Sequence, residues 1–264
     1  MLNRATLLGA VCAVALTAIP YTSAMAAAPM GFAGTVSGAY SHTSDSSGGP
    51  DTNNWNINGA GAFGLSPDFG AQVDGGYEHA SGGGTDLDIW TIEGSAFWAP
   101  AFGRIGGTVG YGSADFGGGF DVSVWTYGGF GEFYAGNFVT LGGHAGGFSW
   151  DVAGFSDTGW YLGGGITGYV IPNLALTGTI DYYDVSGSNW TAYTVGAEWQ
   201  VSDAVPVSIF GGYQNTQFSG GGGHADTWLV GVKFYIGGNG MPLVANQRNG
   251  TLGWVGKPLG SFSF

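Results

Sequence analysis

Few side chains in this sequence could do acid–base or electrostatic chemistry, because only 9% of its 264 residues are charged. Eight charged residues fall inside segments that otherwise alternate apolar residues with small or polar ones. They are Asp74, Glu78, Glu93, Arg104, Glu132, Asp181, Glu198 and Lys233. Asp74 and Glu93 fall at similar positions in consecutive segments, so paired acid–base chemistry is one interpretation. No other residues are placed to hold a substrate beside these two acids. Attraction of cations is therefore the favoured interpretation.

The four histidines are the other residues with catalytic potential. His144 shares the predicted face of the charged residues, and its expected neighbours Gly128 and Gly163 offer it no hydrogen-bond partner. The others, which we place at solvated rims and in a loop, are His42, His79 and His224. No serine or acid stands at catalytic spacing with any histidine, so we predict no catalytic residue and no enzyme activity. No metal motif or cofactor-binding motif is found either.

The elements that must position these residues recur along the chain. Pentapeptides such as "WTIEG" and "WYLGG" begin at Trp55, Trp90, Trp125, Trp160, Tyr193 and Trp228, with starts 35, 35, 35, 33 and 35 residues apart. Between them the hydrophobic pattern has period two, which is typical of strands with two different faces. A fixed period of this length therefore indicates one two-stranded hairpin per repeat.

Twelve strand segments are predicted from this pattern. They lie near 31–42, 54–65, 69–79, 86–98, 103–113, 122–134, 138–148, 158–170, 174–184, 190–201, 206–215 and 227–236. The connections alternate between short turns, such as 135–137, and longer loops rich in Gly, Ser and Asp, such as 44–54 and 149–158. Short turns at one end and long loops at the other are typical of outer-membrane barrels. We predict an all-β fold, a transmembrane antiparallel up-and-down barrel of about 12 strands.

The two faces of each predicted strand differ in chemistry. One parity carries aromatic residues near the strand ends, where amphipathic rings suit the membrane–water interface. The predicted interface residues are Tyr40, Trp55, Tyr77, Trp90, Tyr111, Trp125, Trp160, Tyr182, Tyr193, Tyr213, Trp228, Trp98 and Trp199. A soluble β-protein gives no reason for such an alignment. All eight strand charges lie on the opposite parity, and together with His144 we predict that they line the lumen.

The inward face also predicts how open the lumen is, in two competing ways. Small residues leave space for water at Gly76, Gly106, Gly128, Gly142, Gly163 and Gly212. Large rings that would fill that space are Tyr161, Tyr169, Tyr183, Phe130 and Phe210. Arg104 and Glu132 meet near the short-turn mouth, either as a constriction with a transverse field or as a cross-strand pair that satisfies two buried charges.

Three parts are predicted along the chain. Residues 1–26 form a signal peptide, with a basic start, an apolar run and the ending Ala24-Met25-Ala26. Residues 27–237 form the barrel, and residues 238–264 form a tail that is periplasmic or adds short strands. Without Arg4 the chain has 4 basic and 18 acidic residues, a net charge of −14, which argues against nucleic acid as a partner.

The signal peptide, the Trp-led strand starts and aromatic-rich endings such as "WLVGVKFYI" carry a resemblance. The chain resembles small glycine-rich, porin-like outer-membrane β-barrel proteins of Gram-negative bacteria. The resemblance implies a barrel in outer-membrane lipid, in a class that includes channels, adhesins and structural anchors. Because six of the eight strand charges are acidic, we predict a monomeric channel that passes small, mostly cationic or neutral solutes. The alternative is a non-conducting surface barrel, an adhesin or structural envelope protein, that acts through its extracellular loops. The long tail departs from such barrels, which usually end on an aromatic residue of the last strand.

Overall fold

The computed structural model describes residues 31–46, 48–116, 121–152, 155–220, 223–237 and 240–248. The predicted signal peptide, residues 1–26, and the part of the tail that follows residue 248 lie outside the described residues.

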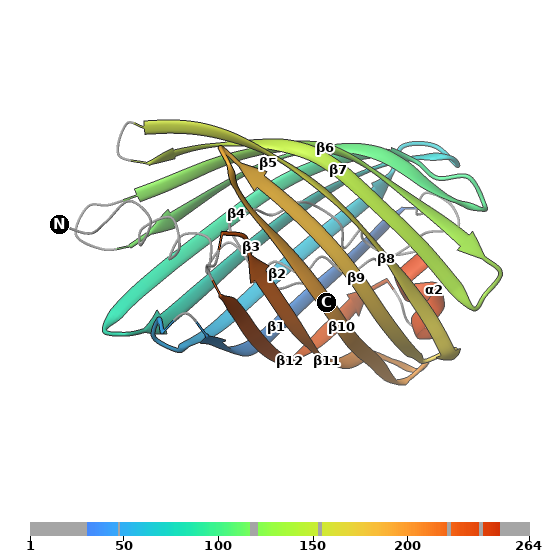
Figure 1. The fold of residues 1–264 in the computed structure, drawn as a ribbon. Helices are drawn as coiled ribbons and strands as arrows, with labels where there is room; N and C mark the ends of the chain where they lie inside the picture. Colours follow the sequence, from blue (N-terminus) through green and yellow to red (C-terminus); the bar gives the residue numbers. More distant parts are fainter. Residues whose placement is uncertain are drawn as a thin grey trace.

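Twelve strands run obliquely around one barrel (Figure 1). Their bounds are β1 Phe32–Asp45, β2 Thr52–Gly64, β3 Phe69–Gly82, β4 Thr85–Trp98, β5 Gly103–Asp115, β6 Asp121–Ala135, β7 Val139–Val152, β8 Phe155–Ile171, β9 Leu174–Val185, β10 Ser188–Ser202, β11 Val205–Phe218 and β12 His224–Ile236. Each strand pairs antiparallel with the next, and β1 closes the ring by pairing with β12 from Gly34↔Ile236 to Asp45↔Ala225. The prediction of a twelve-strand, antiparallel up-and-down barrel is confirmed.

Two hairpins at the long-loop end are shorter than the rest. Gly83 and Gly84 join β3 to β4, and Ser186 and Gly187 join β9 to β10, all four with positive φ. A two-residue turn with positive φ at both positions matches the twist of a hairpin, and glycine adopts this conformation without strain. These turns fix the register of their strands.

The strands extend further toward the long-loop end than the sequence pattern predicts. β7 continues to Val152 and β8 begins at Phe155, so most of the loop expected at 149–158 is strand. One short helix, α2 (Leu243–Arg248), follows β12 and was not predicted. In the part of the chain that the structure describes, no helix is long and apolar enough to cross a membrane.

The two faces of the wall separate apolar from polar side chains. Large apolar side chains such as Ile92, Val109 and Leu162 are more than half exposed on the outside. Charged and amide side chains such as Glu93 and Gln72 are buried inside. A barrel of this pattern suits an apolar surrounding and a polar interior.

Candidate functional site in the barrel lumen

The structure places the nine predicted lumen residues on the inner face, each with at most 8% of its surface exposed. They are Asp74, Glu78, Glu93, Arg104, Glu132, His144, Asp181, Glu198 and Lys233. Because the turns mark the two ends of the barrel, the position of a residue along its strand gives its depth. Arg104, Glu132, Glu198 and Lys233 lie near the short-turn mouth, and the others lie deeper.

Arg104 and Glu132 are directly opposite one another on β5 and β6. The guanidinium donates to Glu132 Oε2 through Nε at 2.9 Å, and its Nη2 lies 2.9 Å from the same oxygen. The Tyr134 hydroxyl donates to this oxygen at 3.1 Å. This geometry favours the cross-strand pair over an open constriction with a transverse field.

A second ion pair joins the last three strands at the same mouth. Lys233 Nζ donates to Glu198 Oε2 at 3.1 Å. The hydroxyls of Ser208 and Tyr235 both donate to Glu198 Oε1 at 2.5 Å, and Gln247 Nε2 of α2 donates to Oε2 at 3.0 Å. Since a buried charge is costly without partners, these four donors stabilise the carboxylate where it is.

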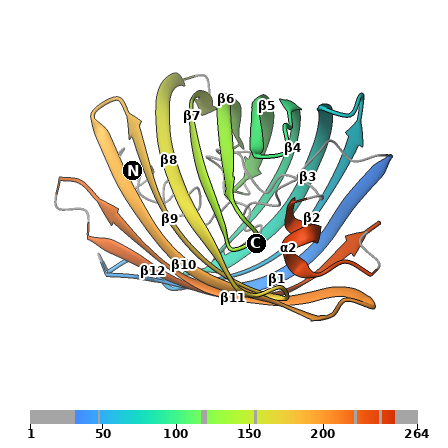
Figure 2. The same cartoon turned by 90° about the vertical axis from the view of Figure 1, so that its right-hand side faces the viewer.

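The helix α2 lies inside the short-turn mouth, as the end view in Figure 2 shows. Leu243 is fully buried and packs with Tyr169, Ala175 and Tyr235 of the wall. Asn246 Nδ2 donates to Gln200 Oε1 at 2.9 Å. Part of the tail therefore enters the barrel instead of trailing from it.

Arg248 fixes the end of α2 to the β6–β7 turn. Its guanidinium donates to the carbonyl oxygens of Gly136 and Val139, and to Thr140 Oγ1 at 3.2 Å. It also lies 4.9 Å from the ring centre of Tyr134 and 5.3 Å from that of Tyr169. Sequence reasoning missed this cation, although Pro242 just before "LVANQR" is a recognisable helix-start signal.

His144 has a partner that the sequence analysis did not find. Its register neighbours are Phe130, not the expected Gly128, and Gly163. Gly163 lacks a side chain, so His144 reaches across β8 to Asp181 of β9, with Nε2 3.2 Å from Oδ1. The prediction of an isolated histidine is wrong, because it considered only adjacent strands.

Asp74 and Glu93 are register partners on β3 and β4, as their positions in the hairpin predict. Gln72 Nε2 donates to both carboxylate oxygens of Asp74, at 2.7 and 2.8 Å. Glu78 lies on the same face of β3 and is fully buried. Three carboxylates thus concentrate on one sector of the inner wall, β3 and β4.

Several inward glycines are covered by neighbouring side chains. A Cβ at Gly106 would meet Phe97 and Phe130, one at Gly128 would meet Tyr161, and one at Gly163 would meet His144 and Asp181. The space that these glycines leave is therefore partly taken by rings lying along the wall, including Phe130 and Tyr161 of the predicted filling rings.

The predicted interface aromatics lie on the outer surface near the strand ends. Most are 38–63% exposed, and Tyr111, Tyr182 and Tyr213 are less so. Neighbouring rings contact one another: Trp55 and Tyr77 have ring centres 5.3 Å apart, and Tyr213 and Trp228 4.7 Å. A belt of contacting amphipathic rings at this position suits a membrane–water boundary.

His224 has Asp226 beside it, as their positions in the sequence indicate, and also Ser46, which the sequence analysis did not place there. Ser46 Oγ lies 3.0 Å from His224 Nδ1, and His224 Nε2 lies 3.4 Å from Asp226 Oδ2. The Ser46 hydroxyl also donates to the His224 carbonyl oxygen at 2.8 Å and accepts from its backbone N–H at 2.7 Å. A serine held by the backbone in this way fastens β1 to β12 at the rim.

The other rim histidines also contact acids: His79 Nδ1 lies 2.8 Å from Asp88 Oδ1, and His42 Nε2 lies 3.9 Å from Asp51 Oδ2. Across the described ranges, no group of three His, Cys, Asp or Glu residues is arranged to hold a metal ion.

Comparisons with known proteins agree on the fold. No family model and no curated protein matches the sequence. The translocator domain of the autotransporter NalP from Neisseria meningitidis aligns at 12% identity and a TM-score of 0.53, over 87% of this chain and 95% of that chain. The KdgM porin aligns at 11% identity and a TM-score of 0.51, over 75% and 98%. The β-domain of the Bordetella autotransporter Brka aligns at 11% identity and 0.53, over 78% and 100%.

At such identities the likeness extends to the fold alone. The chain is a closed twelve-strand barrel of the outer-membrane type, and the resemblance to porin-like outer-membrane barrels is confirmed at that level. This fold indicates the bacterial outer membrane as its location.

Proposed function

We propose that this barrel is a channel for passive diffusion of small, mostly cationic or neutral solutes across the bacterial outer membrane. It acts as a monomer, without enzymatic activity, and reaches the membrane through a signal peptide cleaved after Ala26.

The observation that carries the proposal is the charge of the inner wall. Six acidic side chains point inward, against two basic ones from the strands and Arg248 from α2. The three basic groups all lie at the short-turn mouth, where each is engaged by the wall. Asp74, Glu78 and Glu93 lie deeper, and a lumen with acidic side chains attracts cations and repels anions.

The number of strands supports a lumen wide enough for solutes. Barrels of about eight strands are filled by their own side chains, and the interior widens as strands are added. A barrel of twelve strands is wider than the eight-stranded barrels that side chains alone fill, and many of its inner residues are small or polar.

The alternative, a non-conducting surface barrel acting through its loops, is favoured by a different observation. α2 lies in the short-turn mouth, and rings cover several inner glycines. In this case the loops at the other end would be the functional part.

Single-channel recording in planar bilayers tests the proposal. The full mature chain is compared with a chain that ends at Ile236, which keeps all twelve strands. Conductance by the full chain, with a reversal potential that favours cations, supports the channel. Conductance by the truncated chain alone supports a barrel whose lumen the tail blocks. If neither chain conducts ions, the channel is contradicted. Mass spectrometry of the purified protein checks whether it begins at Ala27.

A further inference from the structure

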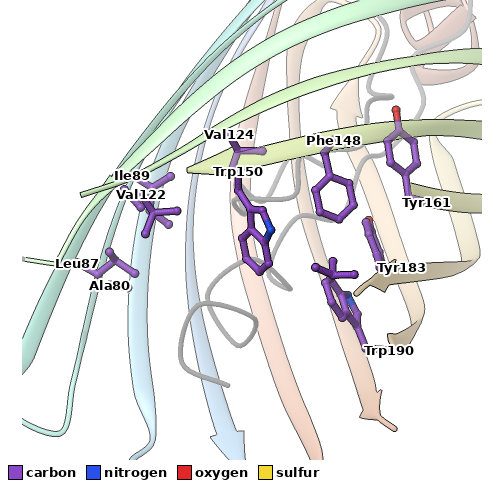
Figure 3. Packing of buried hydrophobic residues seen from close by; sticks show 12 residues of the cluster. Ala80, Leu87, Ile89, Val122, Val124, Phe148, Trp150, Tyr161, Tyr183 and Trp190 are labelled. Atoms are coloured by element: carbon purple, nitrogen blue, oxygen red, sulfur yellow. The ribbon is translucent and has the colours of Figure 1, made fainter. Parts of the chain in front are cut away.

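The inner wall changes character around its circumference near the long-loop end. The sector from β4 to β10 is apolar, with Ile89, Val124, Phe148, Trp150, Tyr183 and Trp190 facing inward (Figure 3). On the other side, β11, β1 and β2 are polar, with Gln214, Thr216, Ser41, Thr43, Asn54 and Asn56 facing inward, while β12 between them is mixed, with Thr227 and Leu229. At this end, one side of the lumen is therefore apolar, and the other side carries groups that can form hydrogen bonds.

The apolar sector contains two donors without a partner. The indole N–H groups of Trp150 and Trp190 are buried and make no hydrogen bond to any described residue. Trp190 stacks on Tyr183, with ring centres 5.2 Å apart and planes 11° apart. Trp150 is two residues from the end of β7, and Trp190 two residues from the start of β10, so both lie at the same level of the lumen.

The polar sector also has unpartnered groups, on residues two to four positions from the long-loop ends of their strands. Ser41 Oγ, Asn54 Oδ1, Asn56 Nδ2 and Gln214 Oε1 are buried and make no hydrogen bond to the described parts of the chain. Buried polar groups are almost always hydrogen-bonded, because leaving them unpaired is costly. Donors and acceptors on both sides of one belt therefore point to a polar occupant. We call Trp150, Trp190, Ser41, Asn54, Asn56 and Gln214 the lumen belt.

The chemistry of the lumen belt narrows the class of occupant. Aromatic faces favour a ring with an apolar face, and amide and hydroxyl groups favour a solute whose hydroxyls both donate and accept. Glu78 on the adjacent strand β3 disfavours an anion. A pyranose sugar without charge has all three properties, since its ring carries C–H groups on its faces and hydroxyls at its edge.

We propose that the lumen belt is a binding site for neutral sugars, with the ring against Trp150 and Trp190 and the hydroxyls on the amides of β2 and β11. This inference rests on the proposed channel and names one solute class for it. A sugar held there lies in the path between the long-loop mouth and α2.

The test compares glucose with sorbitol, which has similar size, no charge and many hydroxyls but no ring. The full mature protein is placed in planar bilayers, and the block of its ion current is titrated with each compound. Calorimetry on the detergent-solubilised protein measures binding independently of conduction. Benzyl alcohol serves as a ring without the sugar hydroxyls. We expect glucose to block and bind, and sorbitol and benzyl alcohol to do so at least about tenfold more weakly.

Variants locate the site. The double change Trp150→Leu and Trp190→Leu should weaken glucose binding about tenfold, since it removes both ring faces and both N–H donors. The double Phe variant, which keeps the rings, should lose less and covers the case in which the Leu variant does not fold. Trp125→Leu changes a tryptophan of the outer surface on the neighbouring strand β6 and should leave binding unchanged.

The outcomes separate the site from the channel. An ion current without any glucose block or binding overturns the sugar site and leaves the channel intact. Equal effects of glucose and sorbitol, or stronger binding of benzyl alcohol, also overturn it. Glucose binding by calorimetry without conductance supports the site and contradicts the channel.

Discussion

His144 Nε2 lies 3.2 Å from Asp181 Oδ1, although β8 separates the strands that carry them. The contact passes over Gly163, which is the register partner of both residues. A Cβ at Gly163 would overlap both side chains. The buried pair can therefore form only because residue 163 is a glycine.

Gly163→Ala should displace the pair and lower the free energy of unfolding by about 1–3 kcal/mol, the usual cost of overpacking. Gly168→Ala is the matched control on the same strand, because a Cβ there meets nothing within 4 Å. Urea titration followed by the heat-dependent mobility of the barrel on gels measures both. In a background in which His144 and Asp181 are both Ala, the cost of Gly163→Ala should vanish. If it persists there, the pair is not the reason for the glycine.

The strands could be predicted from the sequence because each one repeats the same requirement. Trp90 and Ile92 share the outer face and Glu93 lies on the inner one, and a one-residue shift would turn the carboxylate outward, so the pattern fixes the face of every residue. The contact between Arg104 and Glu132 could be predicted because both residues belong to one hairpin. Contacts within a hairpin are local, and this is why they could be predicted.

Contacts that skip a strand or leave the repeat could not be predicted in this way. His144 and Asp181 meet because the β7–β8 and β8–β9 pairings both place them opposite Gly163, which has no side chain between them. Neither pairing can be read from the alternation of residues within one strand. α2 has six residues, too few for helix propensity to be decisive. Its position is set by tertiary contacts, which include the packing of Leu243 against Tyr235 and the bonds from Arg248 to the β6–β7 turn.

Arg248→Ala should release α2 from the short-turn mouth. Hydrogen bonds to a charged group contribute about 1.5–3 kcal/mol each, and the change removes those to Gly136, Val139 and Thr140. We expect faster cleavage of the tail by a protease of low specificity, with the strands still protected. Arg248→Lys keeps the charge but not the planar fork and should be intermediate. A tail in Arg248→Ala that is as resistant as in the parent would show that α2 is held by its apolar contacts with Tyr169 and Tyr235.

Asp74→Asn with Glu93→Gln should reduce the preference of the channel for cations. At 4 Å in water a unit charge attracts a cation by about 1 kcal/mol, so each neutralised acid lowers the local cation concentration by about fivefold at most. The reversal potential in a salt gradient should move toward zero. Asp88→Asn at the long-loop rim serves as a control for acids outside the lumen, because Asp88 has the parity opposite to inward Ile89 and a side chain that is 51% exposed. A reversal potential unchanged by the double variant would assign selectivity to other groups.

Val73→Arg tests whether the outer surface faces lipid. Val73 is 54% exposed on β3, four residues from each of the outer rings Phe69 and Tyr77, so water would receive an arginine there at little cost. In lipid, an arginine at mid-depth costs about 2–4 kcal/mol, and one near the interface about 0–1 kcal/mol. Tyr40, 51% exposed and near the long-loop end of β1, is the matched position at the interface. Unfolding from lipid vesicles should therefore show a large loss of unfolding free energy for Val73→Arg and a small one for Tyr40→Arg. Equal, small losses at both positions would indicate that water covers the outer face, because only a membrane makes the cost of a charge depend on its depth.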